Sequence, residues 1–246
     1  MSDVLAVVAA EPAEDGVLRL AEHLGHLLAG RMRRFPVAAR EQREFAVSVV
    51  AEIRDESVGV AVLRVDPDPD RAFWEIIRRS RKPVVALPRG VEVGERPISR
   101  VLLPLDGTVV SARAVTPAVQ LLLDAGTEVI ATHVFDTSTV PAFWDQAAHG
   151  RPAFSDEFVR RHLPGGVRLA LRRGSAAEQV LAESELTGAD LLLLGWAQLL
   201  TPGRAGLVRR VLAGPVPVML VGTGSGRSDD EEGTFGPPPR DEDPGV

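Results

Sequence analysis

The first residues that could do chemistry are Asp106, Gly107 and Thr108, which follow an apolar run and precede an amphipathic one. This order predicts a turn from the carboxyl end of a strand into a helix, the place where open parallel sheets bind ligands. The Asp106 carboxylate could accept hydrogen bonds from an amino or hydroxyl group of a ligand. An Asp-Gly pair also shapes turns and caps helices, so a purely structural role for Asp106 is the alternative.

A second group of candidate residues is rich in glycine and follows an almost purely aliphatic run. It extends from Gly195 to Gly206 and contains Gly203 and Arg204. Glycines let backbone N–H groups converge on a phosphate, and the dipole of a following helix favours an anion there. Arg204 could add a forked guanidinium to such a site. Alternatively, Gly203 belongs to a plain turn and Arg204 is a solvated surface charge.

Two further groups of residues have a more ordinary interpretation. Asp66, Asp68 and Asp70 alternate with two prolines, so this run repels a phosphate and offers few backbone donors. It lacks the glycine and the terminal glutamate of a calcium loop, and we predict a solvated acidic loop. Trp196 follows a buried strand and is expected to pack, while His133 within a strand has a structural role. The sequence predicts no catalytic residue and no metal ligand.

Short β-branched runs alternate with amphipathic segments along the chain, which predicts parallel α/β units. We expect strands over residues 4–10, 31–39, 58–65, 83–87, 100–105, 128–135, 167–172, 191–194 and 216–221. We expect helices over residues 15–30, 41–57, 71–80, 111–124, 156–162, 176–186 and 206–212.

The two halves of this pattern end alike, in strand, helix and strand, which indicates an internal duplication with a degenerate first copy. We predict a domain at 1–90, a linker at 91–99, a second domain at 100–222 and a tail at 223–246. Each domain should be a small open, mostly parallel sheet with helices on both faces, as in Rossmann-like folds.

Composition excludes several classes of function. The 246 residues carry a formal net charge of −6, and seven of the acids lie in the tail. Without a broad basic surface we expect no nucleic-acid partner, and no apolar stretch reaches the roughly 20 residues of a membrane span. Cysteine is absent, which suits a reducing cytoplasm. The tail is rich in glycine, proline and acids, and we predict that it is disordered.

Four segments together resemble the universal stress protein family. They are RVLLPLDGT (100–108), EVIATHVFD (128–136), RRGSAAEQVLAESELTGADLLLLGW (172–196) and RRVLAGPVPVMLV (209–221). The resemblance implies a fold of the adenine-nucleotide alpha-hydrolase-like kind and an adenine site near Pro104, Asp106 and the backbone of Val134. The family commonly pairs its domains through their last strands, so the resemblance also implies that the two copies pair within one chain as a monomeric pseudo-dimer, with a homodimer as the alternative. The first half resembles the family in outline only: its first strand ends in Glu11-Pro12, and this copy is not expected to bind nucleotide.

The family binds phosphates with a glycine, two residues, a glycine, nine residues, a glycine and then serine or threonine. Gly195 fits the first position, but Gln198 occupies the second, and the last pair falls on Ala205-Gly206 after a shortened stretch. The resemblance as a whole implies a stress-response sensor that binds ATP in its C-terminal copy, with Mg²⁺ only as part of the nucleotide complex. The departures from the phosphate pattern favour the main alternative, a nucleotide-free interaction module. A weak ATPase is a minor alternative.

Overall fold

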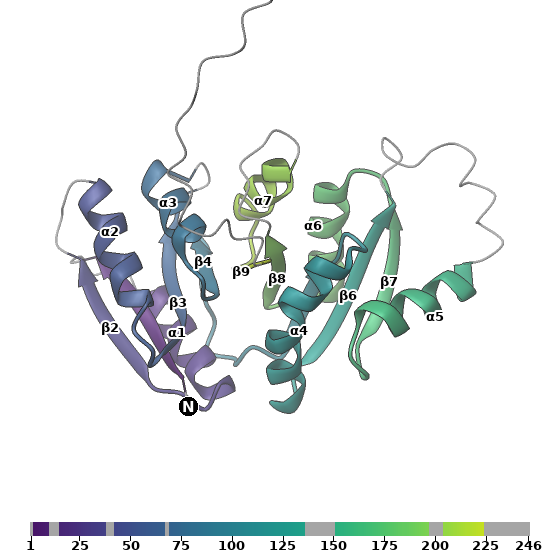
Figure 1. The fold of residues 1–246 in the computed structure, drawn as a ribbon, viewed down its shortest axis with the longest axis horizontal. Helices are drawn as coiled ribbons and strands as arrows, with labels where there is room; N and C mark the ends of the chain where they lie inside the picture. The colour runs from purple at the N-terminus through teal and green to yellow at the C-terminus, as the bar shows by residue number, and fades with distance from the viewer. Residues whose placement is uncertain are drawn as a thin grey trace, which may run out of the picture.

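The computed structural model describes residues 2–9, 15–37, 42–66, 69–135, 151–196 and 204–223. Within these ranges strands and helices alternate (Figure 1). The N-terminal half consists of β1 (Asp3–Ala9), α1 (Asp15–Leu27), β2 (Met32–Val37), α2 (Gln42–Ile53), β3 (Val58–Val65), α3 (Arg71–Arg79) and β4 (Val84–Pro88). The C-terminal half consists of β5 (Arg100–Pro104), α4 (Val109–Asp124), β6 (Glu128–Phe135), α5 (Arg151–His162), β7 (Arg168–Arg173), α6 (Ala176–Thr187), β8 (Leu191–Trp196), α7 (Arg204–Leu212) and β9 (Val218–Gly222).

The strands of the described ranges form one sheet in the order β2-β1-β3-β4-β9-β8-β5-β6-β7. Neighbouring strands are parallel except β4 and β9, which pair antiparallel at the centre, with Val85 opposite Met219. The predicted α/β fold with mostly parallel strands is confirmed. The two sheets that we expected form one continuous sheet, because the last strands of the two halves pair within the chain.

Two apolar cores lie on opposite faces of this sheet. Helices α1, α4 and α5 cover one face, and α2, α3, α6 and α7 cover the other (Figure 1). Strands β3, β4 and β8 are buried at nearly every residue, as strands covered on both faces must be. No helix in the described ranges is long and apolar enough to cross a membrane.

Most predicted elements lie close to their expected positions, and β3 and β6 have the predicted bounds. Helix α2 ends at Ile53, earlier than predicted, because the Asp55 carboxylate accepts hydrogen bonds from the Ser57 N–H at 2.9 Å and hydroxyl at 2.7 Å. This Asx turn competes with continuation of the helix. Helix α5 begins earlier than predicted, at Arg151, and strand β8 extends two residues further, to Trp196.

Residues 89–99, which include the predicted linker at 91–99, form neither helix nor strand. They are nevertheless tied to the fold, because Ile98 is buried and the Arg19 guanidinium donates to the carbonyl oxygen of Val93 at 2.8 Å. The division into separate domains stays a prediction. The predicted disorder concerns the tail beyond Thr223, and these residues lie outside the described part of the chain.

Candidate functional site

The chain reverses direction across the sheet at one place in each half. In the C-terminal half, β5 is followed by β6 on one side, whereas the later strand β8 lies on its other side. In the N-terminal half, β1 lies between β2 and β3 in the same way. Open parallel sheets bind ligands beyond the carboxyl ends of the strands at such points. Because β4 and β9 pair antiparallel, the carboxyl ends of the two halves lie at opposite ends of the sheet. The residues after β5 and at the end of β8 are therefore the first to consider.

Asp106 shapes the turn that leads from β5 into α4. Its Oδ1 accepts hydrogen bonds from the Thr108 N–H at 2.9 Å and hydroxyl at 2.8 Å, and its Oδ2 accepts one from the Ser111 hydroxyl at 3.0 Å. Thr108 caps the helix, so α4 begins at Val109, before the predicted start. The carboxylate is exposed to solvent, and each oxygen has more than one lone-pair site. The structural role is thus visible, and the ligand-binding role of Asp106 stays a prediction.

Gly107 adopts a φ of +81°, which a residue with a side chain rarely takes. A Cβ atom here would lie 3.4 Å from His133 Cε1 and 3.4 Å from Phe158 Cε2. His133 Nδ1 is 2.8 Å from the Leu105 carbonyl oxygen, and its ring lies 4.9 Å from that of Phe158. These two rings form a wall beside the turn. The sequence indicates a structural role for His133 but contains no signal for Phe158, because only the packing of α5 brings Phe158 to β6.

The backbone N–H and C=O groups of Val134 point toward the region just beyond the carboxyl end of β5. The Thr132 carbonyl oxygen accepts a hydrogen bond from the Leu105 N–H at 2.9 Å, so Thr132 faces β5. Hydrogen-bonding groups alternate in direction along a strand, and the N–H and C=O of Val134 therefore face the same side. Strand β5 ends at Pro104, which pairs with Thr132. Val134 lies two residues beyond the partner of Pro104, so Pro104 and Val134 are close together at the strand ends. The predicted adenine site needs them in this arrangement.

Gly195 lies within β8 and brings that strand close to α4. A Cβ atom at this position would lie 3.3 Å from the Ser111 carbonyl oxygen and 3.3 Å from Val115 Cγ1. Asp106 bonds the same Ser111, so the ends of β5 and β8 meet at the first turn of α4. The next residue, Trp196, is 4% exposed and packs against Trp74 with ring centroids 6.2 Å apart. Its indole is part of the core, as predicted.

The predicted phosphate loop falls largely on residues that the structure does not describe. Gln198 and Gly203 lie outside the described residues. Helix α7 begins at Arg204, two residues earlier than predicted, so Gly206 lies in the first turn of the helix. The loop that was predicted to reach Gly206 therefore ends before Arg204. N–H groups in a first helical turn lack partners within the helix and can still face an anion.

The corresponding point of the N-terminal half has different residues. Arg64 is the next-to-last residue of β3 and pairs with Leu87, just as Gly195 is next to last in β8 and pairs with Val221. A Cβ atom on Gly16 of α1 would lie 2.9 Å from Arg64 Nη2. The Arg64 side chain therefore extends to the first turn of α1, whereas Gly195 has no side chain and α4 packs directly against β8. No local pattern in the sequence singles out Arg64, although it has the same position in β3 as Gly195 has in β8.

The acidic run of the first half is described in part. Asp66 forms an ion pair with Arg89, and the Asp70 carboxylate accepts a hydrogen bond from the Phe73 N–H at 2.8 Å as the N-cap of α3. Asp68 lies outside the described residues. Among the described residues, no three His, Asp or Glu side chains cluster as metal ligands would. The two described aspartates serve an ion pair and a helix cap.

Comparison with known proteins decides the family. The model of the universal stress protein family matches residues 97–222, just over half of the chain. The chain belongs to this family. No curated protein sequence matches it significantly. The match begins just before β5 and ends with β9, so it contains every residue of the predicted site.

Solved structures of similar fold extend over both halves. A universal stress protein from Archaeoglobus fulgidus DSM 4304 is 14% identical, with a TM-score of 0.64 over 90% of this chain and 98% of that chain. PA1789 from Pseudomonas aeruginosa PAO1, a functionally unknown protein, is 13% identical, with a TM-score of 0.64 over 90% of this chain and 92% of that chain. The N-terminal half, outside the family match, therefore shares the arrangement of a two-copy universal stress protein fold.

Proposed function

We propose that this chain is a non-catalytic regulatory protein that binds an adenine nucleotide at the carboxyl ends of β5, β6 and β8. The observation that carries the proposal is the convergence of Asp106, the Val134 backbone and Gly195 at the switch point of the C-terminal half. A carboxylate that accepts, a backbone edge that donates and accepts, and a strand end without a side chain are what an adenosine needs there.

The base, the adenosine and the phosphates of the nucleotide each contact a different group of residues in this arrangement. The adenine edge, which both donates and accepts, meets the N–H and C=O of Val134, and the Asp106 carboxylate accepts from the adenosine. The phosphates extend past Gly195 toward the first turn of α7, where Gly203, Arg204 and Gly206 stand in the sequence. ATP is the expected ligand, and Mg²⁺ enters with it, bound to the phosphates.

A nucleotide-free interaction module is the second candidate, and one observation favours it. The Asp106 carboxylate already accepts three hydrogen bonds within its own turn, so the residue has a complete structural role without any ligand. In that case the same turn would be retained for folding, and regulation would proceed through protein contacts alone.

Titration calorimetry with ATP and Mg²⁺ separates the two candidates. We expect a dissociation constant in the micromolar range, corresponding to about −8 kcal/mol, and at least tenfold weaker binding to Asp106→Ala. Asp106→Asn keeps an acceptor for the Thr108 N–H and guards against misfolding. Asp124→Asn, at the exposed far end of the same helix, is the matched control and should bind like the wild type.

No heat at millimolar ATP would contradict nucleotide binding and leave the interaction module. Phosphate release should be followed in the same samples. Turnover above background that is abolished by Asp106→Ala would contradict the non-catalytic part of the proposal.

A further inference from the structure

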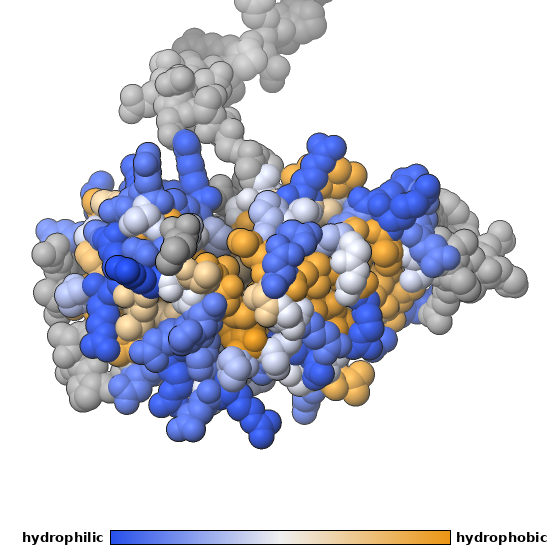
Figure 2. Space-filling model, turned by 90° about the horizontal axis from the view of Figure 1, so that it is seen from below, coloured by the Kyte–Doolittle hydropathy of each residue, from blue (hydrophilic) through white to orange (hydrophobic). Residues whose placement is uncertain are grey.

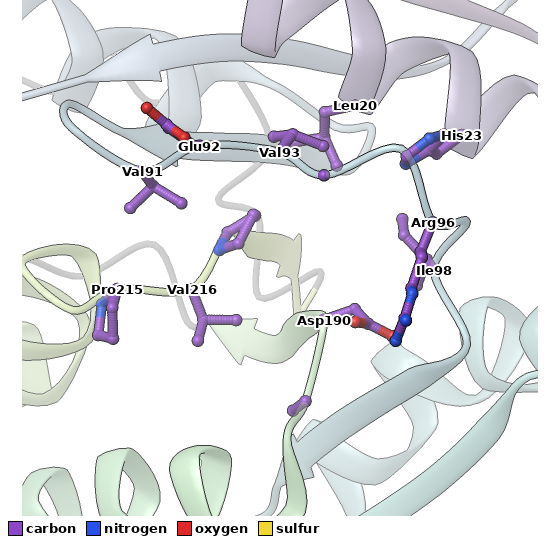
Figure 3. A pocket seen from close by; sticks show the side chains of 13 residues that line it. Leu20, His23, Val91, Glu92, Val93, Arg96, Ile98, Asp190, Pro215 and Val216 are labelled. Carbon is purple, nitrogen blue, oxygen red and sulfur yellow. The ribbon is translucent and has the colours of Figure 1, made fainter.

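A cavity of about 180 Å³ lies between the two halves, at the end of the sheet opposite the nucleotide site. Its walls come from α1, from the connection 91–98, from Ala189–Asp190 before β8 and from Pro215–Pro217 before β9 (Figure 3). Seen from below, apolar surface reaches solvent in the middle of this end of the molecule, bordered by hydrophilic side chains (Figure 2). A cavity of about 150 Å³ holds one benzene, so this one has room for about six to nine non-hydrogen atoms.

Apolar residues line part of the cavity, but polar atoms make up more of its exposed wall than apolar atoms do. Leu20 and Ile98 are almost fully buried, while Val93 and Val216 are half-buried and line the cavity from two sides. In Figure 3, Leu20 and Val93 lie along one side of the cavity, and Ile98 lies near one end. Small-molecule sites combine such walls with a few convergent polar groups and are frequent between domains.

The polar part of the wall is concentrated at Asp190 and Arg96. Asp190 Oδ2 accepts hydrogen bonds from the Ser99 N–H at 2.8 Å, the Ser99 hydroxyl at 2.9 Å and the Arg100 N–H at 2.9 Å. These bonds fix the carboxylate and leave Oδ1 as an acceptor. The Arg96 side chain extends toward Asp190 in Figure 3, and within the described part of the chain it has no ion pair.

The other titratable groups of the wall complete the charge pattern. His23 is 9% exposed, and burial lowers its pKa, so the imidazole is neutral at pH 7. Glu92 lines the cavity at the end away from Arg96 (Figure 3). A simple anion would therefore face the carboxylates of Asp190 and Glu92, and a simple cation would face Arg96. A small ligand that carries both charges next to an apolar group avoids both conflicts.

We propose that this cavity binds a free α-amino acid with a small aliphatic side chain. The ligand carboxylate pairs with the Arg96 guanidinium, and its ammonium donates to Asp190 Oδ1. The aliphatic side chain packs among Leu20, Val93 and Ile98. Because α1, the connection and the loops before β8 and β9 all line the cavity, the bound amino acid would contact both halves of the protein.

Calorimetry and thermal-shift measurements on the full chain test this proposal with L-leucine as the probe. Two truncated probes serve as chemical controls: 4-methylpentanoate lacks the ammonium, and 3-methylbutylamine lacks the carboxylate. We expect leucine to bind and each truncated probe to bind at least tenfold more weakly. Equal binding of all three, or no binding of leucine at millimolar concentration, would overturn the proposal.

Variants locate the site. Arg96→Gln removes an exposed cation and should weaken leucine binding at least tenfold, while Val93→Phe should fill the cavity and abolish binding. Arg78→Gln removes an exposed arginine from α3, on the other face of the sheet, and should bind leucine like the wild type. Undiminished binding by both Arg96→Gln and Val93→Phe would show that leucine binds elsewhere and would contradict the proposal.

Discussion

The two halves of the molecule place different side chains at the same point of the same topology. Gly195, the next-to-last residue of β8, has no side chain and lies beside the first turn of α4, whereas the side chain of Arg64, the next-to-last residue of β3, reaches the first turn of α1. After β5 stands Asp106, bonded into its turn, and after β1 the sequence has Glu11-Pro12. The common fold therefore does not decide ligand binding; a few residues at the strand ends do.

The halves nevertheless share one structural unit. Strands β4 and β9 pair at the centre of the sheet, and on one face Trp74 of α3 contacts Trp196 of β8. The Arg209 guanidinium of α7 lies over the Trp74 ring at 5.5 Å. Trp196 follows Gly195 directly, so the proposed nucleotide site of one half adjoins a contact with the other.

The largest effect is expected from breaking the central strand pair. Val85→Asp places a charge at a position that is 0% exposed, opposite Met219, and should lower the free energy of unfolding by about 4 kcal/mol. Val47→Asp, on the exposed face of α2, is the control and should cost less than about 1 kcal/mol. Urea denaturation measures both. A small loss in Val85→Asp would mean that the halves are not stabilised through their shared strands.

The next largest effect comes from making one half resemble the other. Gly195→Arg introduces the residue that β3 has at the equivalent position, and its Cβ would meet Ser111 and Val115 at 3.3 Å. We expect at least tenfold weaker ATP binding by calorimetry and a lower melting temperature. Gly165→Arg adds the same charge at a turn where an added Cβ has no neighbour within 4 Å, and it should bind normally. Equal affinities in both variants would contradict the placement of the site.

A smaller effect should separate the structural role of Asp106 from its role in binding. Asp106→Ala removes three hydrogen bonds from an exposed turn and should lower the free energy of unfolding by about 1 kcal/mol. Asp106→Asn should recover most of this stability, because its carbonyl oxygen still accepts from Thr108. Thermal and urea unfolding without ligand give the values. Unchanged stability in Asp106→Ala would mean that the turn does not need the carboxylate.

The smallest effect concerns acid stability in the N-terminal half. Hydrogen bonds from the Ser57 hydroxyl and N–H, and then from Arg33, lower the pKa of Asp55 to about 2. Since the folded pKa lies below the unfolded value of 3.8, Asp55 stabilises the fold above about pH 4 and loses this contribution as the pH falls toward 2. Asp55→Asn should flatten this part of the stability profile slightly. A profile that keeps the wild-type slope would contradict the assignment.

Much of the fold could be predicted from the sequence, because its signals are local. The apolar runs of β3 and β6 predicted their bounds, and the turn residues predicted the position of Asp106 at the end of β5. The pairing of β4 with β9 and the position of Val134 beside Asp106 were expected from the resemblance to the family, and both lie where that resemblance implies.

The remaining features depend on contacts between distant segments. Phe158 reaches His133 only through the packing of α5, and Arg64 fills its space only because α1 returns to β3. The cavity at Arg96 and Asp190 combines segments that are far apart in the chain. No single segment carries a pattern for such contacts, so the sequence could not predict them.

The stoichiometry of ATP binding tests the contrast between the halves most directly. Calorimetry on the full chain should give one site per chain with micromolar affinity, because only the C-terminal switch point combines Asp106 with Gly195. Two equivalent sites per chain would contradict the assignment of Arg64 as the residue that occupies the first site. No binding at millimolar ATP would contradict the nucleotide site of the second half.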